Sequence, residues 1–273
     1  MNRIRRIAAA FTVVGVLGIA APAVASATSL ITISGATASY PLVSLLAAKY
    51  VKTHPHKVKF KITQGGAQIG INDVAAGRVT IGDVSRDPLP TDPPGLDFYP
   101  IARYAICVVT NKSNPLSNLT AAQLLSIFTG KTRTWSGVPG ATATGTIDLI
   151  SRTSVAGVLT NFQTLLLGGK KVAEPLAAEE ASEGLLKQQV ENDPNSIGFL
   201  SNYQADSGGV NSVGFNGVGC TIANAVSAQY AGVARFYEVT KGPVLGAARS
   251  FISWVDHSKA AQKIISSQWI PVT

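Results

Sequence analysis

The sequence has few charged residues, few cysteines and few histidines. Charged side chains make up 14% of the 273 residues, against 46% for hydrophobic ones. This balance excludes an intrinsically disordered chain, which combines little apolar surface with much charge. Two cysteines and three histidines are too few to build a metal site, and we expect no cofactor. The chain also has no Gly-x-Ser-x-Gly motif, so nothing in it predicts a hydrolase that carries its nucleophile on such a turn.

Long runs of basic residues are missing as well, although the formal net charge is +8. The densest basic cluster, Lys52 to Lys61, alternates with apolar residues as one face of a strand does. The charge therefore predicts a weak attraction for anions and no nucleic-acid partner.

A long apolar stretch occurs only at the N-terminus. The residues MNRIRR precede an apolar run from Ile7 to Ala21, and small residues follow it. This pattern predicts a secretory signal peptide over residues 1–27, cleaved after Ala25 or Ala27. The run of about 15 residues is shorter than the roughly 20 that a spanning helix needs.

Cleavage would remove three arginines and lower the formal charge from +8 to +5. No cysteine lies near the cleavage point, so a lipid anchor is not expected. We therefore expect a secreted or periplasmic protein that does not insert into the membrane.

The two cysteines leave two interpretations open. Cys107 and Cys220 would be able to pair in an oxidising compartment. Cys107 also lies in the apolar run Ala105 to Val109, where a buried, unpaired cysteine is the alternative. His54 and His56 flank Pro55 in an expected loop, and His257 follows Asp256 on an expected surface helix. With no nucleophile placed beside these histidines, we do not expect an enzyme.

Strands and helices are expected to alternate along the mature chain. The expected strands are Ile31–Ile33, Val58–Ile62, Val79–Val84, Tyr99–Thr110, Thr146–Ile150 and Ile197–Leu200. The expected helices are 41–52, a short one ending at Ala76, Leu119–Phe128, 159–166, Glu179–Glu191, Val244–Val255 and Ala260–Ser267. This alternation predicts an α/β protein with a mainly parallel sheet, and the length suits two such layers.

Three segments repeat one arrangement: a strand, a turn of small residues and the start of a helix. They are Gly35–Pro41, Gly65–Gly70 and Arg152–Val158. The first turn of a helix leaves backbone N–H groups without partners and carries partial positive charge, so such ends bind phosphate or sulfate. One alone is an ordinary N-cap. Three in one chain, one of them preceded by an arginine, indicate an anion site.

Several segments, in order, resemble the phosphate-binding subunits of ABC phosphate importers. These segments are Gly35–Pro41, Gly65–Gly70, Ile81–Arg86, Asn118–Lys131 with Trp135, Arg152–Gly157, Ser196–Phe199 and Phe251–Pro271. The stretch from Leu119 to Trp135 is the most specific, and the resemblance covers nearly all of the mature chain. It implies a two-lobed fold of the type II periplasmic-binding-protein kind, each lobe a mainly parallel sheet flanked by helices.

The resemblance also implies the organisation and the partners of the chain. Lobe 1 would comprise residues 28–105 plus 220–273, and lobe 2 residues 106–219. The protein would be a monomer that captures a small inorganic anion, phosphate or a similar oxyanion, and delivers it to a membrane ABC permease.

Ligand residues carry over position by position. The first loop implies contacts from Thr37, Ser39 and the amide of Tyr40, and the third from the Ser85-Arg86 pair. The remaining implied positions are Gly66 and Ala67 in the second loop, and Arg152, Ala156, Gly157 and Val158 in the fourth.

Three of these positions depart from the family pattern. Ala67, Ala156 and Val158 stand where the family has hydroxyl side chains, so three hydrogen-bond donors are missing. The alternative is therefore a divergent extracellular binder or sensor with another ligand or weak phosphate affinity. Asp83 and Asp87, which flank the Ser85-Arg86 pair, would be able to accept the proton that phosphate carries. For Asp83 we favour a structural role instead, as the cap of a strand end or as the partner of Arg86.

Overall fold

The computed structural model describes residues 28–174 and 176–272. The predicted signal peptide and both predicted cleavage sites, after Ala25 and Ala27, lie outside these residues. No helix within the described ranges has the length and the apolar character needed to cross a membrane.

Strands and helices alternate through most of the chain, as expected. The strands are β1 (Ser29–Gly35), β2 (Val58–Gln64), β3 (Ile81–Val84), β4 (Leu96–Asn111), β5 (Asn118–Leu119), β6 (Asp148–Arg152), β7 (Ala177–Glu180), β8 (Ser196–Ser201), β9 (Val210–Phe215) and β10 (Val233–Lys241). The helices are α1 (Tyr40–Thr53), α2 (Ala67–Ala75), α3 (Ala121–Phe128), α4 (Gly157–Leu165), α5 (Glu183–Asn192), α6 (Asn202–Asp206), α7 (Ile222–Val226), α8 (Gly246–His257) and α9 (Lys259–Gln268), with a 3-10 turn at Trp135–Gly137.

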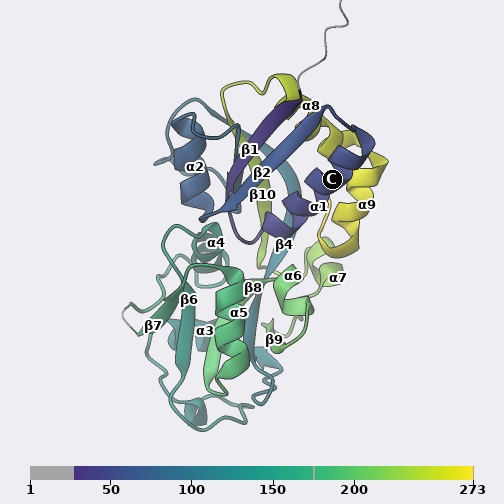
Figure 1. The fold of residues 1–273 in the computed structure, drawn as a ribbon. Coiled ribbons are helices and arrows are strands. Elements are labelled where there is room, and N and C mark those ends of the chain that lie inside the picture. Colours follow the sequence, from purple (N-terminus) through teal and green to yellow (C-terminus); the bar gives the residue numbers. More distant parts are fainter. Residues whose placement is uncertain (1–27, 175, 273) are drawn as a thin grey trace, which may run out of the picture.

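The strands form two halves that meet along β4, with the order β2-β1-β3-β10-β4-β8-β6-β7. We call the part from β2 to the first half of β4 the upper lobe, and the part from the second half of β4 to β7, with β9 and β5, the lower lobe (Figure 1). Outer pairs such as β1 with β2 and β6 with β8 are parallel. β10 and the first half of β4 pair antiparallel. The result is an α/β fold with two helix-flanked lobes.

β4 is the one continuous strand that both lobes share among the described residues. From Leu96 to Ala105 it pairs with β10, and from Ile106 onward it pairs with β8. β9 pairs with its last residues, Val108 to Asn111. The change of partner falls between two adjacent residues, so the passage from one lobe to the other takes place within a regular strand.

Apolar spacing explains how the helices cover the sheet. In α1, Leu42, Leu46 and Tyr50 recur at helical spacing and are buried, and Pro41 occupies the first turn, where a missing N–H costs nothing. In α3, the Thr120 side chain and the Gln123 side chain form a reciprocal capping box that fixes where the helix begins.

The upper lobe buries apolar side chains on both faces of its sheet. A small cluster that includes Ala67, Ile71, Val74 and Val239 lies under α2. The main cluster lies under α1 and α8 and continues into the lower lobe. β3 is buried along its whole length as a consequence.

A disulfide joins Cys107 to Cys220, whose Cα atoms lie 5.5 Å apart. The paired alternative is therefore the one that the structure shows. Cys107 lies on β4 just after the change of partner, and Cys220 immediately precedes α7, which packs against β4.

Four strands were not expected from the sequence, and one of them, the two-residue strand β5, pairs with β9. β10 crosses the centre of the sheet, β9 pairs with the end of β4, and β7 occupies the edge beside β6. The helix expected from Glu179 begins only at Glu183, because Ala177–Glu180 pair with Leu149–Arg152 as a parallel strand.

Candidate functional site

Three strand-to-helix turns from the two lobes meet around one pocket. The β1–α1 and β2–α2 turns come from the upper lobe and the β6–α4 turn from the lower lobe. The pocket is a narrow gap and is lined by Ala36, Thr37, Ala38, Gly66, Ala67, Ser85, Arg152, Ala156, Gly157 and Val158. Eight of these ten are residues that the sequence predicted as ligand contacts. Ala36 and Ala38 were missed, although both lie in the first predicted loop.

Glycine permits the close approach of the turns. A Cβ atom on Gly157 would lie 2.6 Å from the Ser85 hydroxyl oxygen and 2.9 Å from the Cβ of Ala67, both across the cleft. Gly66 has a φ of +106°, and a Cβ there would lie 2.8 Å from the side chain of Val155. The two lobes therefore touch at backbone distance, and the structure shows a closed cleft.

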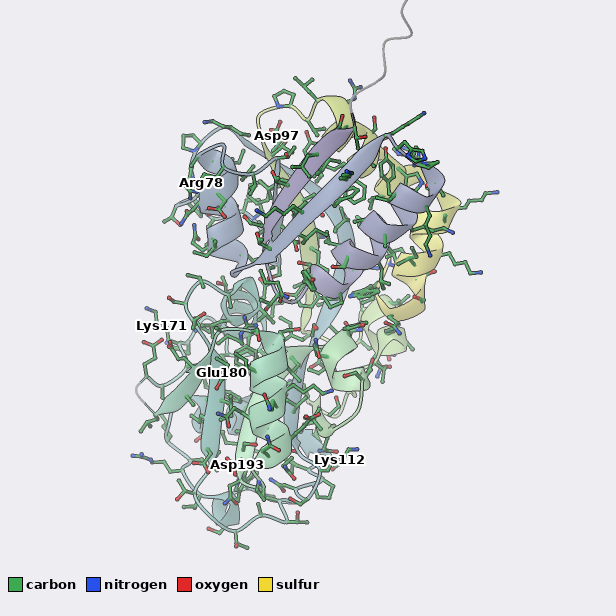
Figure 2. All side chains as sticks on the ribbon, viewed as in Figure 1. Arg78, Asp97, Lys112, Lys171, Glu180 and Asp193 are labelled. Carbon is green, nitrogen blue, oxygen red and sulfur yellow. A yellow bond between two sulfur atoms is a disulfide. The ribbon has the colours of Figure 1, made fainter. Side chains whose placement is uncertain are left out.

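Arg152 brings a buried positive charge to the pocket, with a residue exposure of only 1%. Its Nε donates to the carbonyl of Glu180 at 2.9 Å, and its Nη2 donates to the carbonyl of Ala181 and to Thr37 Oγ1, both at 3.0 Å. Its Nη1 is buried and has no hydrogen-bond partner among the described residues. Glu180 lies on the lower lobe, on the side that faces the upper lobe (Figure 2).

Glu183 balances the charge of Arg152 from behind the pocket. Burial lowers the pKa of Arg152, and the Glu183 carboxylate opposes that shift. Burial raises the pKa of Glu183, while Arg152 and two hydrogen bonds from Ser201 favour its ionised form. Because an arginine keeps its proton in proteins, the guanidinium remains available to an anion.

Thr37 links the two lobes and presents a donor. Its Oγ1 accepts the bond from Arg152 Nη2 and a second one from the backbone N–H of Glu183 at 3.4 Å. A hydroxyl oxygen has two lone pairs, so the remaining function of Thr37 is to donate its hydrogen.

The first turns of α2 and α4 supply backbone donors. Ala67 is the first residue of α2, and Gly157 and Val158 are the first two residues of α4. N–H groups at these positions have no partner within their helix. The side chains of Ala67, Ala156 and Val158 add only apolar atoms to the pocket, as the sequence predicted.

Arg86 does not line the pocket. Its Nη2 and Nη1 bind the two carboxylate oxygens of Asp92 at 2.6 and 2.9 Å, and they also reach Gln68 Oε1 and the carbonyl of Asp87. Burial opposes ionisation of Asp92, but the bonds from Arg86 and from the Leu89 N–H hold its pKa below the usual value. The expected pairing of Arg86 with Asp83 is wrong, because the nearer carboxylate of Asp92 takes the guanidinium.

Ser39 and Asp83 form a buried pair beside the pocket rather than in its lining. Ser39 Oγ donates to Asp83 Oδ1 at 2.6 Å, and Tyr40 begins α1 without contributing to the lining. Asp83 is the register partner of Glu238 on β10, so both carboxyl groups face the same side of the sheet. Neither oxygen of Glu238 has a hydrogen-bond partner among the described residues. Burial raises the pKa of Asp83 to about 7, and burial together with Asp83 raises that of Glu238.

The arrangement as a whole suits a small anion. The described residues contain no group of three or more His, Cys, Asp or Glu side chains placed to hold a metal. The pocket instead gathers a guanidinium, hydroxyl groups and helix N-termini, all of which favour negative charge.

Comparison with known proteins agrees with this geometry. A family model described as the PBP superfamily domain matches residues 22–255. The chain belongs to this superfamily. Its match to the Bacillus subtilis phosphate-binding protein PstS is 27% identical over 253 residues, which is 90% of this chain and 82% of that protein.

Two solved structures show the same PBP fold. A phosphate ABC transporter substrate-binding protein from Clostridium perfringens, with bound phosphate, aligns with a TM-score of 0.84 and 29% identity over 90% of this chain and all of that one. An ABC-type phosphate transport receptor from Vibrio cholerae aligns with a TM-score of 0.71 and 26% identity, over 88% of this chain and 99% of the receptor. The predicted family and fold are thereby confirmed.

Proposed function

We propose that this PBP-superfamily chain is a secreted solute-binding protein that captures an inorganic oxyanion, phosphate above all, for a membrane ABC permease. The observation that carries the proposal is the buried Arg152 guanidinium, whose Nη1 has no partner among the described residues and which lies where the N-termini of α2 and α4 meet the turn before α1. A positive group excluded from water and supplied with spare donors is a binding site for a small anion.

The relatives support phosphate as the ligand. The Bacillus subtilis relative is named a phosphate-binding protein, and the Clostridium perfringens structure contains phosphate. We extend phosphate binding to this chain because Thr37, Ser85, Arg152 and Gly157 line its pocket.

The lobe limits given above, residues 28–105 plus 220–273 and residues 106–219, form part of the proposal. The change of partner of β4 between Ala105 and Ile106 supports the first limit. A pocket enclosed by the two lobes of one chain supports a monomeric binder. We also infer binding without catalysis, since no described residue that lines the pocket is a histidine, cysteine or carboxylate that would act as a general base.

One observation favours a second candidate, a divergent sensor or binder of another ligand. Ala67, Ala156 and Val158 place apolar groups where hydroxyl donors would face the anion. Each lost charge-assisted hydrogen bond removes about 1.5–3 kcal/mol, so three absences weaken phosphate binding strongly unless the backbone amides compensate.

Calorimetric titration of the signal-free protein with phosphate, sulfate, molybdate and a phosphonate separates the two. We expect phosphate to bind with a micromolar or lower Kd. Absence of binding across the whole panel would refute the proposal and favour the sensor.

A further inference from the structure

The pocket offers hydrogen-bond donors almost exclusively. Arg152 Nη1, the Thr37 hydroxyl hydrogen and the first N–H groups of α2 and α4 all donate. Among the described residues that line it, none carries a carboxylate or another side chain that only accepts.

Three backbone carbonyls of the lining residues already accept hydrogen bonds. The carbonyl of Ser85 receives the Tyr104 hydroxyl at 2.8 Å and Asn161 Nδ2 at 2.7 Å. The carbonyl of Gly66 receives the Gly70 N–H, and that of Ala156 receives the N–H of Leu159.

The nearest carboxylates are likewise engaged elsewhere. Asp92 holds Arg86, Glu183 accepts from Ser201, and Asp83 accepts from Ser39. None of the three lines the pocket. The Ser85 hydroxyl, which is able to donate or accept, is the one remaining side-chain acceptor in the described lining.

This donor excess bears on which oxyanion fits. Phosphate near neutral pH keeps a proton on one oxygen, and that O–H needs an acceptor once it is buried, whereas sulfate has four bare oxygens. A site that selects phosphate over sulfate must supply the acceptor. The one lining side chain free to do so among the described residues is the Ser85 hydroxyl, which accepts as a neutral group and not as a carboxylate.

We propose that this pocket selects its ligand by charge and tetrahedral shape and not by protonation, so that it takes sulfate-type dianions as readily as hydrogen phosphate. The proposal rests on the proposed function, because it assumes that the pocket binds an oxyanion. It predicts that the pocket does not discriminate between the two anions, so that the Kd for sulfate is less than about 10 times the Kd for phosphate. One unmade hydrogen bond would produce a ratio of about 10.

The test is calorimetric titration of the wild-type, signal-free protein with sodium sulfate and with sodium phosphate in the same buffer. Comparable Kd values, or tighter sulfate binding, support the proposal. Phosphate binding more than about tenfold tighter than sulfate overturns it and leaves the proposed function standing. Failure of both anions to bind refutes the proposed function and this inference together.

Two variants of one residue provide an internal control, each first checked by its melting curve. Ser85→Ala removes the ambivalent hydroxyl and should shift the Kd ratio further toward sulfate. Ser85→Asp installs an acceptor and should shift it toward phosphate by about tenfold or more. If Ser85→Ala leaves the ratio unchanged, the acceptor argument is wrong at this residue. The wild-type titration decides the proposal even if Ser85→Asp does not fold.

Discussion

At the scale of single residues, Arg152 and Glu183 form the charged centre of the cleft. Both side chains are buried, the charge of Glu183 favours the ionised form of Arg152, and the guanidinium lines the pocket. Removing one member of a buried pair leaves the other charge without compensation, which is costly. We therefore expect a change at Arg152 to act on ligand binding and on stability at once.

Replacement of Arg152 by alanine should weaken phosphate binding at least ~100-fold, since a charge-assisted bond and the site's positive charge are both lost. It should also lower the free energy of unfolding by about 3 kcal/mol, because Glu183 is left buried and uncompensated. Calorimetry and urea unfolding measure the two effects.

Arg78→Ala is the matched control. Arg78 is exposed, pairs with Asp73 and lies at the outer edge of the upper lobe (Figure 2), so the same loss of charge should leave affinity unchanged. Equal affinity of the Arg152 variant and the wild type would remove Arg152 from the site.

Asp83 and Glu238 predict a pH dependence of stability. The pKa of Asp83 rises from 3.8 to about 7 on folding because of burial, with the Ser39 bond opposing. Between these values the folded state holds a proton that the unfolded chain has released. The free energy of unfolding should therefore fall, by an amount on the order of 2–4 kcal/mol, as the pH rises through this range.

Asp83→Asn should flatten that dependence and be more stable than the wild type above about pH 7, since the amide needs no proton to be neutral. Thermal or urea unfolding at pH 5 and pH 8 measures this. Asp256→Asn, at an exposed carboxylate beside His257, is the control and should behave as the wild type. An unchanged slope in Asp83→Asn would show that another group causes the pH dependence.

The positions of residues around the pocket followed from the sequence only where the local turn determines them. Thr37, Arg152 and Gly157 lie in strand-to-helix turns that sequence patterns identify. Ser39 and Arg86 lie in the predicted loops and carry polar side chains, but each binds a carboxylate of the protein. Ser39 donates to Asp83, and Arg86 pairs with Asp92. No local signal shows that Asp92 returns to Arg86 across a proline-rich loop.

At the scale of elements, the start of α4 decides whether the lobes close. Gly157 lies in van der Waals contact with the opposite lobe, where a methyl group has no space. A single added carbon atom should therefore act on closure and leave the fold of either lobe intact.

Gly157→Ala should weaken phosphate binding by tenfold or more, because the methyl group collides with Ser85 and Ala67. Gly184→Ala is the control, because a Cβ atom on Gly184 in α5 would have Ser182 Oγ, at 3.9 Å, as its nearest neighbour. This variant should leave phosphate affinity unchanged and add up to about 1 kcal/mol to the free energy of unfolding. Comparable binding by both variants would mean that the closed contact is not needed for capture.

Restoring hydroxyls at the same helix start should act in the opposite direction. The double change Ala156→Ser and Val158→Thr should tighten phosphate binding about tenfold or more by adding two donors. The serine also occupies the N-cap of α4, which now lacks a side-chain cap, and should add about 1 kcal/mol of stability. Titration and unfolding of one protein sample test both, and weaker phosphate binding would show that the hydroxyls do not reach the anion.

Elements with clear periodicity were predicted, and those fixed by tertiary pairing were not. α1, α3 and α8 carry strong apolar spacing and were found at nearly the expected residues. β10 was missed because its centre buries Tyr237, Glu238 and Thr240, which breaks the alternation of a half-exposed strand. β7 consists of alanine and glutamate, which favour a helix, but pairing with β6 overrides that preference.

At the scale of the whole molecule, the disulfide closes a loop that contains nearly all of the lower lobe. Cys107 and Cys220 are 113 residues apart in sequence. A loop of this size gains most from a cross-link, because the unfolded chain loses much conformational freedom.

Replacing both cysteines by serine should lower the free energy of unfolding by about 3–5 kcal/mol. Phosphate affinity should stay within twofold, since neither cysteine lines the pocket. Urea unfolding with and without reductant is the measurement, and the reductant should have no effect on the double variant. An equally stable double variant would mean that the bridge constrains the unfolded chain very little.

The bridge also determines what a protease would leave behind. A single cut in an exposed turn of the lower lobe, such as the one at Gly168 and Gly169, produces two fragments that remain covalently attached through sulfur. Nicked protein should therefore migrate as one band on a non-reducing gel and as two after reduction. Limited digestion is thus a direct readout of which oxidation state the two cysteines carry.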